Sequence, residues 1–341
     1  MTYWHETPED PKDFRHWLEI ALSQAAMIAF PDADRWSNDT TTSGLWKRIW
    51  WCMYTRDRLV ALNLRRHTVI SDEEFTVPLP TLADFDIQQY PERVIRMLGG
   101  CAILSHLEQQ EQLAQMFIEK CKLCRVLSDI VAPVSDNSMP ATTYHSTALV
   151  KWHSDLPSDI HYQEPPSQPL SEGERALFAY RAWLKMLYLT ASRAQHRQNP
   201  QSSMPSPNSP EASLQSLTNS IASIAEGLHQ HDLIHCLPTT TVGLLMPVLA
   251  THFMNIRSET PDLWQNAFQS LYQCLKALEK LGEVYALAES MATFFQSAIC
   301  GDEIKLSANG GIEKDFLERV LTPGEMQGFE DLVRQERSLV K

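Results

Sequence analysis

WKRIWWCMYTRDRLVALNLRRHTVISDEEFTVPLPTLADF, residues 46–85, is the stretch of sequence that decides the fold. Residues 45–64 are apolar nearly all the way round a period of 3.6, which is typical of a helix buried among other helices. One broad face would consist of Trp46, Ile49, Trp50, Met53, Val60 and Leu64, and most of the remainder of Trp51, Cys52, Leu59 and Leu62. The sequence therefore predicts a tryptophan-rich helix at the centre of the fold.

Three charged residues, Arg56, Asp57 and Arg58, lie in the middle of this apolar helix. Such charges need partners, because removing one member of a buried ion pair typically costs about 3–5 kcal/mol. We favour a structural interpretation, in which Asp57 holds an arginine or caps a neighbouring backbone, and Arg56 or Arg58 extends outward to solvent. The alternative is that the arginines line a pocket for an acidic ligand.

An acidic segment punctuated by prolines follows the helix, and we call residues 71–85 the strap. Pro78 and Pro80 lack the amide hydrogen that a helix requires, so the strap should lie extended over the surface of the helix. Four apolar residues alternate with polar or proline positions and would anchor it: Phe75, Val77, Leu79 and Leu82.

Residues 47–85 resemble the signature of the fungal-specific transcription factor domain, the middle homology region of fungal zinc binuclear cluster regulators, and are most similar to the cutinase transcription factor branch. In that family a tryptophan-rich helix with an arginine-aspartate-arginine centre leads to a basic turn and then to an acidic strap. The residues that match this signature, and that are candidates for an effector pocket, are Trp50, Trp51, Arg56, Asp57, Arg58, Arg65 and Arg66. Further segments that resemble the family are residues 3–13, 117–131, 235–256 and 271–295.

Helical periodicity continues along the rest of the chain, and no stretch alternates as a strand would. Gly99 and Gly100 should form a bend, Ser171 and Glu174 a capping box, and Pro247 a kink or break in its helix. Further helices are predicted at residues 13–28, 91–130, 149–156, 171–196, 210–228 and, as a pair, 261–299. The predicted fold class is all-α: a multi-helix bundle or irregular helical array, with the strap over the buried tryptophan-rich helix.

The predicted organisation is one regulatory domain over residues 1–300. Within it, residues 198–208 are polar and proline-rich and should form a mobile loop, and residues 301–341 should form a tail. The resemblance also implies several helices and a six-cysteine zinc cluster ahead of this domain. Met1 stands almost at the signature, so we expect a truncated member of the family or a regulator that does not itself contact DNA.

Charge and cysteine usage narrow the classes of partner. The formal net charge is −13, and so acidic a surface repels phosphate backbones, which argues against autonomous binding of nucleic acid. The seven scattered cysteines indicate reduced thiols of the cytosol or nucleus, not a disulfide framework. The longest apolar run, residues 242–250, is too short to cross a bilayer, so no membrane partner is predicted.

Two groups of residues have spacings that could suit a metal. Cys121 and Cys124 have the spacing of half a zinc knuckle, but they fall within one predicted helix and lack a second pair. His231, His235 and Cys236 form a denser cluster, with His231 and His235 on one helix face and Asp232 capping a turn. We interpret both groups as structural. No cofactor is therefore predicted in this chain, and zinc is expected only in the missing DNA-binding module.

The predicted function is that of a nuclear regulatory domain that controls transcription by RNA polymerase II of a metabolic gene set. The resemblance implies self-association, a protein partner or a small-molecule effector, with DNA reached only through the missing module or a partner. An alternative is a stand-alone interaction protein that titrates a full-length relative. The absent front helices should also leave exposed an apolar patch of several hundred Å2, more than monomers usually show.

An enzyme of the terpene synthase type is the alternative from another class, since such enzymes are also all-α and acidic. They require an aspartate-rich helix that holds magnesium against a diphosphate. The nearest candidates are residues 72–74 and 84–86, and these lie in the strap instead of on a helix wall. The sequence therefore favours a protein that is not an enzyme.

Overall fold

Helices make up the whole of the regular secondary structure that is described. The computed structural model describes residues 12, 14–27, 40–64, 67–72, 77–131, 141–165, 169–198, 214–255 and 261–300. Within these residues it contains ten α-helices, short 3-10 helices and no strand, so the predicted all-α class is confirmed. The chain divides into two units, one formed mainly by residues 12–62 and 67–199 and the other mainly by residues 200–341. Each is described by itself.

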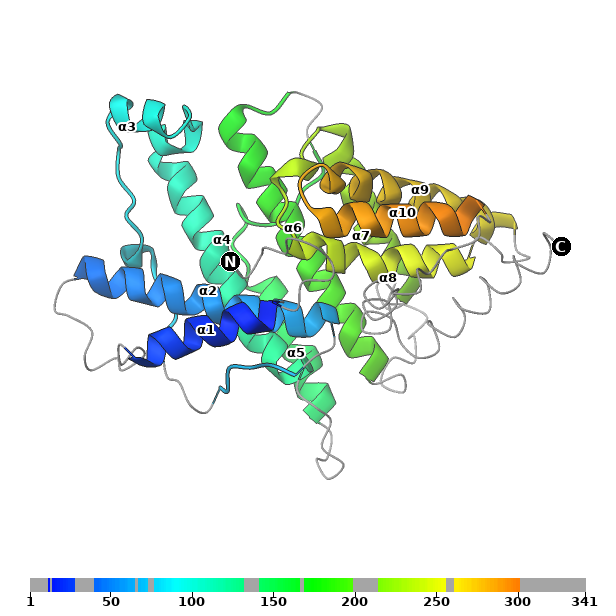
Figure 1. Cartoon of the computed structure of the whole chain (residues 1–341), viewed down its shortest axis with the longest axis horizontal. Coiled ribbons are helices and arrows are strands. Elements are labelled where there is room, and N and C mark those ends of the chain that lie inside the picture. Colours follow the sequence, from blue (N-terminus) through cyan, green and yellow to red (C-terminus); the bar gives the residue numbers. More distant parts are fainter. Residues whose placement is uncertain are drawn as a thin grey trace. The chain divides into compact units, whose positions relative to one another are not determined.

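The first unit contains the tryptophan-rich helix and the strap (Figure 1). Its elements are α1 (Phe14–Met27), α2 (Thr40–Leu64), η2 (Leu82–Asp84), α3 (Glu92–Met97), η3 (Ala102–Ser105), α4 (Leu107–Val131), α5 (Ala141–Ser154) and α6 (Glu172–Gln198). Helix α4 packs against both α5 and α6. The indole Nε1 of Trp152 on α5 donates a hydrogen bond to the carbonyl of Glu119 on α4 at 3.2 Å, and fully buried leucines such as Leu123 and Leu187 fill the contact.

Two local predictions in this unit are confirmed. Gly99 and Gly100 have positive φ values of 78° and 79°, which glycine adopts without steric cost, and they form the bend that follows α3. At the start of α6, the backbone N–H and the hydroxyl of Ser171 both donate to Oε2 of Glu174, at 2.8 and 2.5 Å. This is one half of the predicted capping box, in which the N3 carboxylate accepts from the backbone N–H of the N-cap residue.

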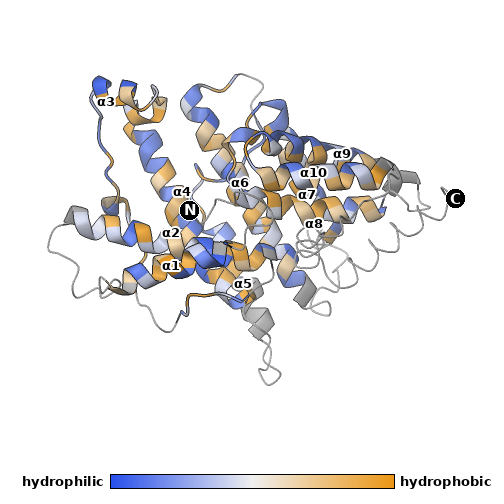
Figure 2. Ribbon diagram, in the orientation of Figure 1, coloured by the Kyte–Doolittle hydropathy of each residue, from blue (hydrophilic) through white to orange (hydrophobic). Residues whose placement is uncertain are grey.

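The second unit is built around α9 (Pro261–Gly282), which packs against the other three helices and against η4 (Ile234–Cys236). The other three are α7 (Leu214–Gln230), α8 (Thr240–Asn255) and α10 (Ala286–Cys300). In Figure 2, α9 and α10 carry both hydrophobic and hydrophilic residues along their length, as expected for helices that cover a core. The predicted helical pair at residues 261–299 is thus confirmed.

The predicted break at Pro247 is wrong, because α8 continues unbroken through this residue to Asn255. A proline inside a helix removes one hydrogen bond and costs about 3 kcal/mol or more. Residues 240–250 of α8 are all buried, so packing on every side of the helix offsets that cost. Among the described residues, no helix has the length and apolar character needed to cross a membrane.

Several predictions fall on residues outside the described ranges. These are the starts of the helices predicted at residues 13 and 210, most of the loop at 198–208, and the tail at 301–341. The apolar patch stays a prediction. Exposed large apolar side chains do occur in the described part of the chain, among them Phe268 and Tyr272, which lie one turn apart on α9.

Candidate functional site

The tryptophan pair at the centre of α2 is buried, with Trp50 and Trp51 each 3 % exposed. Leu59, Val60, Ala61 and Leu62 are buried as well, so the second half of the helix is enclosed as the sequence predicts. The first half is not enclosed on every side, because Ile49 and Cys52 are exposed. The apolar character of the sequence therefore overstates the burial of this half.

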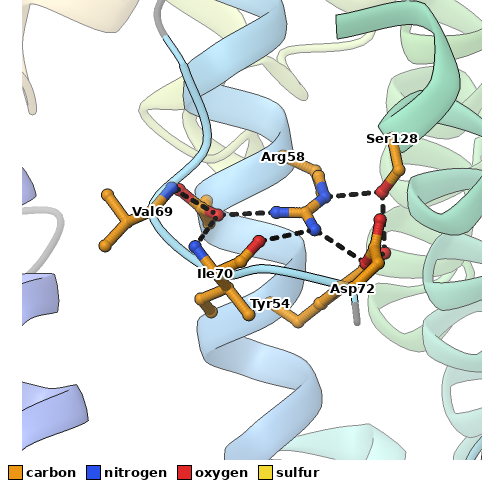
Figure 3. Close-up of polar contacts among 7 residues, drawn as sticks. Tyr54, Arg58, Val69, Ile70, Asp72 and Ser128 are labelled. Carbon is orange, nitrogen blue, oxygen red and sulfur yellow. Dashed lines mark hydrogen bonds and ion pairs between the residues drawn. The ribbon is translucent and has the colours of Figure 1, made fainter. Parts of the chain in front are cut away.

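Asp57 joins α2 to the segment that follows it. Its carboxylate accepts hydrogen bonds from the backbone N–H of Val69, at 3.0 and 3.1 Å, and of Ile70, at 3.0 Å (Figure 3). It also accepts one from Nη1 of Arg58 at 2.7 Å. Burial raises the pKa of Asp57, and these three donors act against that rise. The prediction that Asp57 holds an arginine or caps a neighbouring backbone is confirmed, since it does both.

Arg58 is 1 % exposed, and its guanidinium reaches three parts of the first unit. Besides Asp57, its Nη2 donates to the carbonyl of Ile70 at 2.9 Å and to Asp72 at 2.8 Å, and its Nε donates to Oγ of Ser128 on α4 at 2.6 Å. The guanidinium also lies over the ring of Tyr54, 4.2 Å from its centroid. Such a site uses the several N–H donors of a planar guanidinium, which only arginine has.

The prediction that Arg56 or Arg58 extends outward to solvent is wrong. Arg56 is 6 % exposed and Arg58 only 1 %. The physical reason for Arg58 is that protein acceptors surround its guanidinium, so burial does not cost it hydrogen bonds.

Tyr54, Asp72 and Ser128 complete the cluster, which we call the Arg58 network: Tyr54, Asp57, Arg58, Asp72 and Ser128. The hydroxyl of Tyr54 donates to Asp72 at 2.7 Å and lies 2.8 Å from Oγ of Ser128. Partial burial would raise the pKa of Asp72, but hydrogen bonds from Tyr54 and Ser128 and the charge of Arg58 outweigh it and lower the pKa. The network therefore binds α2, the segment after it and α4 together.

The strap lies along α2, as predicted. Nε1 of Trp51 donates to the carbonyl of Pro78 at 2.9 Å, and Nζ of Lys47 donates to Asp84 at 2.8 Å. Arg48 donates to the carbonyl of Asp84 and, at 2.9 Å, to the carboxylate of Asp86. Both ends of the described strap are thus held by polar side chains of α2.

The anchors of the strap differ in part from those predicted. Val77 is buried as expected, but Leu82 is 40 % exposed and the buried residue at this end is Asp84. The strict alternation ends because residues 82–84 form the 3-10 helix η2, which turns Asp84 back to accept from the backbone and hydroxyl of Thr81 at 2.7 and 3.0 Å. Burial alone would raise the pKa of Asp84, but bonds from Lys47 and Thr81 outweigh it and lower the pKa. Phe75 lies outside the described residues.

Gly44 permits the close approach of the strap to the start of α2. A Cβ at this position would lie 2.8 Å from the carbonyl oxygen of Asp84 and 3.0 Å from its Cα. Real Cβ atoms do not come so close to backbone atoms, so only glycine fits here without a shift of the strap. This glycine is a residue that the sequence analysis did not single out.

Some of the predicted site residues lie outside the cluster. Arg65 and Arg66 fall outside the described residues. His231 and His235 do not share a helix face, because α7 ends at Gln230, and the two histidines lie in a turn and in η4. Asp232 is in that turn, with a φ of 52°. The described residues contain no group of three His, Cys, Asp or Glu side chains placed to hold a metal ion. The predicted candidates His231, His235 and Cys236 therefore do not form such a group.

Cys121 and Cys124 are fully buried on α4. Burial raises the pKa of the Cys124 thiol to about 12 and also raises the pKa of the Cys121 thiol. Both are therefore protonated at neutral pH, and a thiol in this form is neither a nucleophile nor a good metal ligand. They act as small apolar residues of the core.

A cavity between α5 and α6 was not predicted from the sequence. It has a volume of about 100 Å3, and both aromatic and cationic side chains line it. The lining consists of Trp152, His153, Leu156, Ile160, His161, Tyr162, Arg181, Leu184, Lys185 and Tyr188. The only trace in the sequence is the spacing of Arg181 and Lys185, which places them one turn apart on the same side of α6.

Residues 4–161 match the fungal specific transcription factor domain, and these residues include α2, the strap and the whole Arg58 network. Over longer stretches the chain is similar to fungal transcription factors. It is 30 % identical over 346 residues to Cutinase transcription factor 1 beta of Fusarium vanettenii, an alignment that covers 91 % of this chain and 39 % of the relative. It is 29 % identical over 328 residues to Transcription factor cpaR of Aspergillus oryzae, covering 87 % of this chain and 54 % of the relative.

The similarity to Cutinase transcription factor 1 alpha of Fusarium vanettenii is 28 % identity over 305 residues, which covers 87 % of this chain and 32 % of the relative. This chain thus spans about a third to a half of the length of these three relatives. No solved structure matches it. The signature predicted from residues 47–85 is confirmed, because these residues lie within the stretch 4–161 that matches the fungal specific transcription factor domain.

Proposed function

We propose that this chain is the regulatory domain of a fungal transcription factor, and that it acts by binding and conformational change instead of by catalysis. The observation that carries the proposal is that the matched family domain, residues 4–161, contains the Arg58 network. In that network a buried arginine links one helix, the segment after it and a second helix through direct hydrogen bonds. Such a linkage lets a ligand or partner that moves one of these elements move the others.

The proposed setting is the nucleus, where the factor would control transcription by RNA polymerase II of a metabolic gene set. With a net charge of −13, the chain would reach DNA through a zinc-cluster module or a partner that has one. Self-association, or binding of another protein, would transmit the conformational state of this domain to the rest of the factor. The names of the relatives support the class of function, and the choice of target genes is not carried over from them.

Two acidic groups that could have served a diphosphate-binding enzyme have structural roles here. Asp72 accepts from Arg58 and Tyr54, and Asp84 accepts from Lys47 and Thr81. Magnesium ligation would require these carboxylates to give up those bonds. The relatives are transcription factors, in agreement with a chain that is not an enzyme.

A reporter assay tests the proposal. The full chain would be inserted between an unrelated DNA-binding domain and an activation domain, and transcription would be measured in a fungal host. We expect the chain to change reporter output several-fold, and Arg58→Met to abolish this change because it removes the side chain that bonds α2 to both the segment after it and α4. Arg125→Met removes an exposed arginine of α4 and is the matched control, which should behave as the unmodified chain.

Three outcomes would contradict the proposal. One is equal output with the chain, with the Arg58→Met variant and with no insert at all. Another is magnesium-dependent binding of a prenyl diphosphate by the purified chain, which would favour the enzyme. The third is that the unfused chain lowers the activity of a co-expressed full-length relative while the insert has no effect, which would favour a stand-alone interaction protein.

A further inference from the structure

The cavity between α5 and α6 lies entirely within the first unit and is separate from the Arg58 network. Its volume is about 100 Å3. For comparison, an apolar cavity of about 150 Å3 is large enough to hold benzene, and a water molecule occupies about 30 Å3 of liquid. The space therefore suits a ligand of a few non-hydrogen atoms.

Arg181 brings a positive charge to this cavity without an acidic contact. Its Nη2 donates to Oε1 of Gln112 at 3.2 Å, which is a neutral acceptor, and its Nε is buried without a partner among the described residues. Burial lowers the pKa of Arg181, while the charges of Asp159 and Glu174 act in the opposite direction. A guanidinium left in this state gains hydrogen bonds when an anion approaches.

Lys185 stands one turn further along α6 and faces the same cavity. Its Nζ lies 2.9 Å from Nε2 of His153 and 4.9 Å from the centroid of the Tyr188 ring. Burial, followed by the positive charges of Lys185 and His161, lowers the pKa of His153 to about 4. His153 is therefore neutral at physiological pH and accepts a hydrogen bond from the ammonium group, so the charge of the cavity comes from Arg181 and Lys185 and not from this ring.

The remaining walls are apolar or aromatic. Leu156, Ile160 and Leu184 are buried side chains of the lining, and Trp152 and Tyr188 add aromatic surface. An inorganic anion would leave this surface without a partner. An organic acid would place its charged group against the cations and its carbon atoms against the apolar wall.

We propose that this cavity is a binding site for a small organic carboxylate of about two or three carbon atoms. Arg181 binds the carboxylate through its guanidinium, Lys185 adds a second N–H donor, and the leucine and isoleucine side chains contact the carbon atoms. The inference rests on the proposed function, because it names the chemical class of an effector for the regulatory domain.

Helix α4 supports both sites, which gives the ligand a route to the rest of the first unit. Gln112 of α4 accepts from Arg181, and Ser128 of the same helix accepts from Arg58. A carboxylate that takes hydrogen bonds from Arg181 competes with Gln112. Helix α4 is thus the element through which a ligand in the cavity could act on the Arg58 network and the strap.

The test uses the purified full chain and calorimetric titration with acetate and with propionate in a buffer free of other carboxylates. We expect one of them to bind with a dissociation constant on the order of 1 mM, as suits a ligand of this size. Arg181→Gln should weaken binding at least about tenfold, because it removes the charge-assisted bonds. Arg125→Gln, which removes an exposed arginine of α4 outside the cavity, should leave it unchanged.

A second pair of variants keeps the test decisive if Arg181→Gln does not fold. Lys185→Met should weaken binding several-fold, and Lys151→Met, an exposed lysine of α5, should not. Inorganic phosphate is titrated in parallel. The proposal is overturned if neither acetate nor propionate binds, if phosphate binds more tightly than both, or if the cavity variants bind as their controls do.

Binding to the purified chain requires no transcription, so failures of the two proposals are distinguishable. Loss of the carboxylate site with an intact effect of the chain on a reporter would remove the effector and leave the regulatory domain. A confirmed carboxylate site in a chain without any effect on the reporter would leave the ligand and remove the regulatory role.

Discussion

Two arginines of the first unit stand in opposite situations: Arg58 is buried, and Arg181 is half-buried. Arg58 on α2 donates to two carboxylates, a carbonyl and a hydroxyl, whereas Arg181 on α6 donates to one neutral amide and keeps a buried Nε without a partner in the described part of the chain. Both residues sit among apolar side chains, so their sequence contexts look alike. The difference teaches that a buried charge is structural where the protein supplies its acceptors, and available to a ligand where the protein does not.

The largest effect is expected from Arg58→Met. It leaves Asp57 buried without its ion-pair partner, and such a loss typically costs about 3–5 kcal/mol. Urea unfolding of the first unit, followed by tryptophan fluorescence, would measure the change in the free energy of unfolding. Arg125→Met on the exposed side of α4 should change it by less than about 0.5 kcal/mol. A loss below about 1 kcal/mol for Arg58→Met would mean that the network adds little to stability.

Gly44→Ala should come next, since it tests how closely the strap must approach α2. The added Cβ would lie 2.8 Å from the carbonyl oxygen of Asp84, so the strap has to shift. Forcing one methyl group into a packed contact typically costs about 1–3 kcal/mol. The unfolding free energy would report the cost, and faster proteolysis within the strap would report the shift. An alanine variant as stable as the parent would show that the strap is not held at this point.

Acidification should lower the stability of the fold by less than these substitutions. The effect should come from His153, which lines the cavity between α5 and α6. The pKa of His153 is lowered to about 4 in the folded chain, so the folded state favours the neutral ring. The resulting stability is present above the ordinary histidine pKa of about 6.5 and is lost as the pH falls towards 4. Lys185 and His161 are the charged or titratable groups that cause part of this shift.

The His153→Gln variant isolates this contribution. The melting temperature of the parent should fall more between pH 7 and pH 5 than that of the variant, because carboxylates such as Asp72 titrate lower and are common to both. Equal slopes for the two proteins would show that His153 is not held neutral by its surroundings.

The smallest change in stability is expected from Arg181→Gln without ligand. The variant loses one bond to a neutral partner and also relieves the burial of an uncompensated charge, so the two effects should cancel to within about 1 kcal/mol. Urea unfolding of Arg181→Gln and of Arg58→Met under the same conditions compares the two losses in unfolding free energy directly. A loss as large as that of Arg58→Met would show that Arg181 is structural too.

Much of the fold could be predicted because it depends on local patterns. Helical periodicity placed α2, α4, α9 and α10, and the glycine pair and the capping box placed two of the element boundaries. The strap could be predicted because proline excludes helix at Pro78 and Pro80. Pro247 shows the limit of such rules, since its cost is offset by packing that no local pattern reveals.

The candidate site was harder to predict because its contacts are distant in sequence. Asp57 could be assigned a capping role, since the backbone amides that donate to it lie only 12 and 13 residues away. The burial of Arg58 depends in part on Ser128, which is 70 residues away. No local pattern reveals that acceptor, so exposure to solvent was the simpler prediction. The cavity joins side chains of two helices, such as His153 and Lys185, that are 32 residues apart and form no motif.

The central claim is that the Arg58 network holds the segment after α2 in place, and hydrogen exchange at the amides of Val69 and Ile70 tests it most directly. Both amides donate to Asp57, so they should exchange far more slowly than amides of an unstructured peptide. In Arg58→Met their protection should fall by more than that of amides within α4. Rapid exchange of both amides in the unmodified chain would contradict the account.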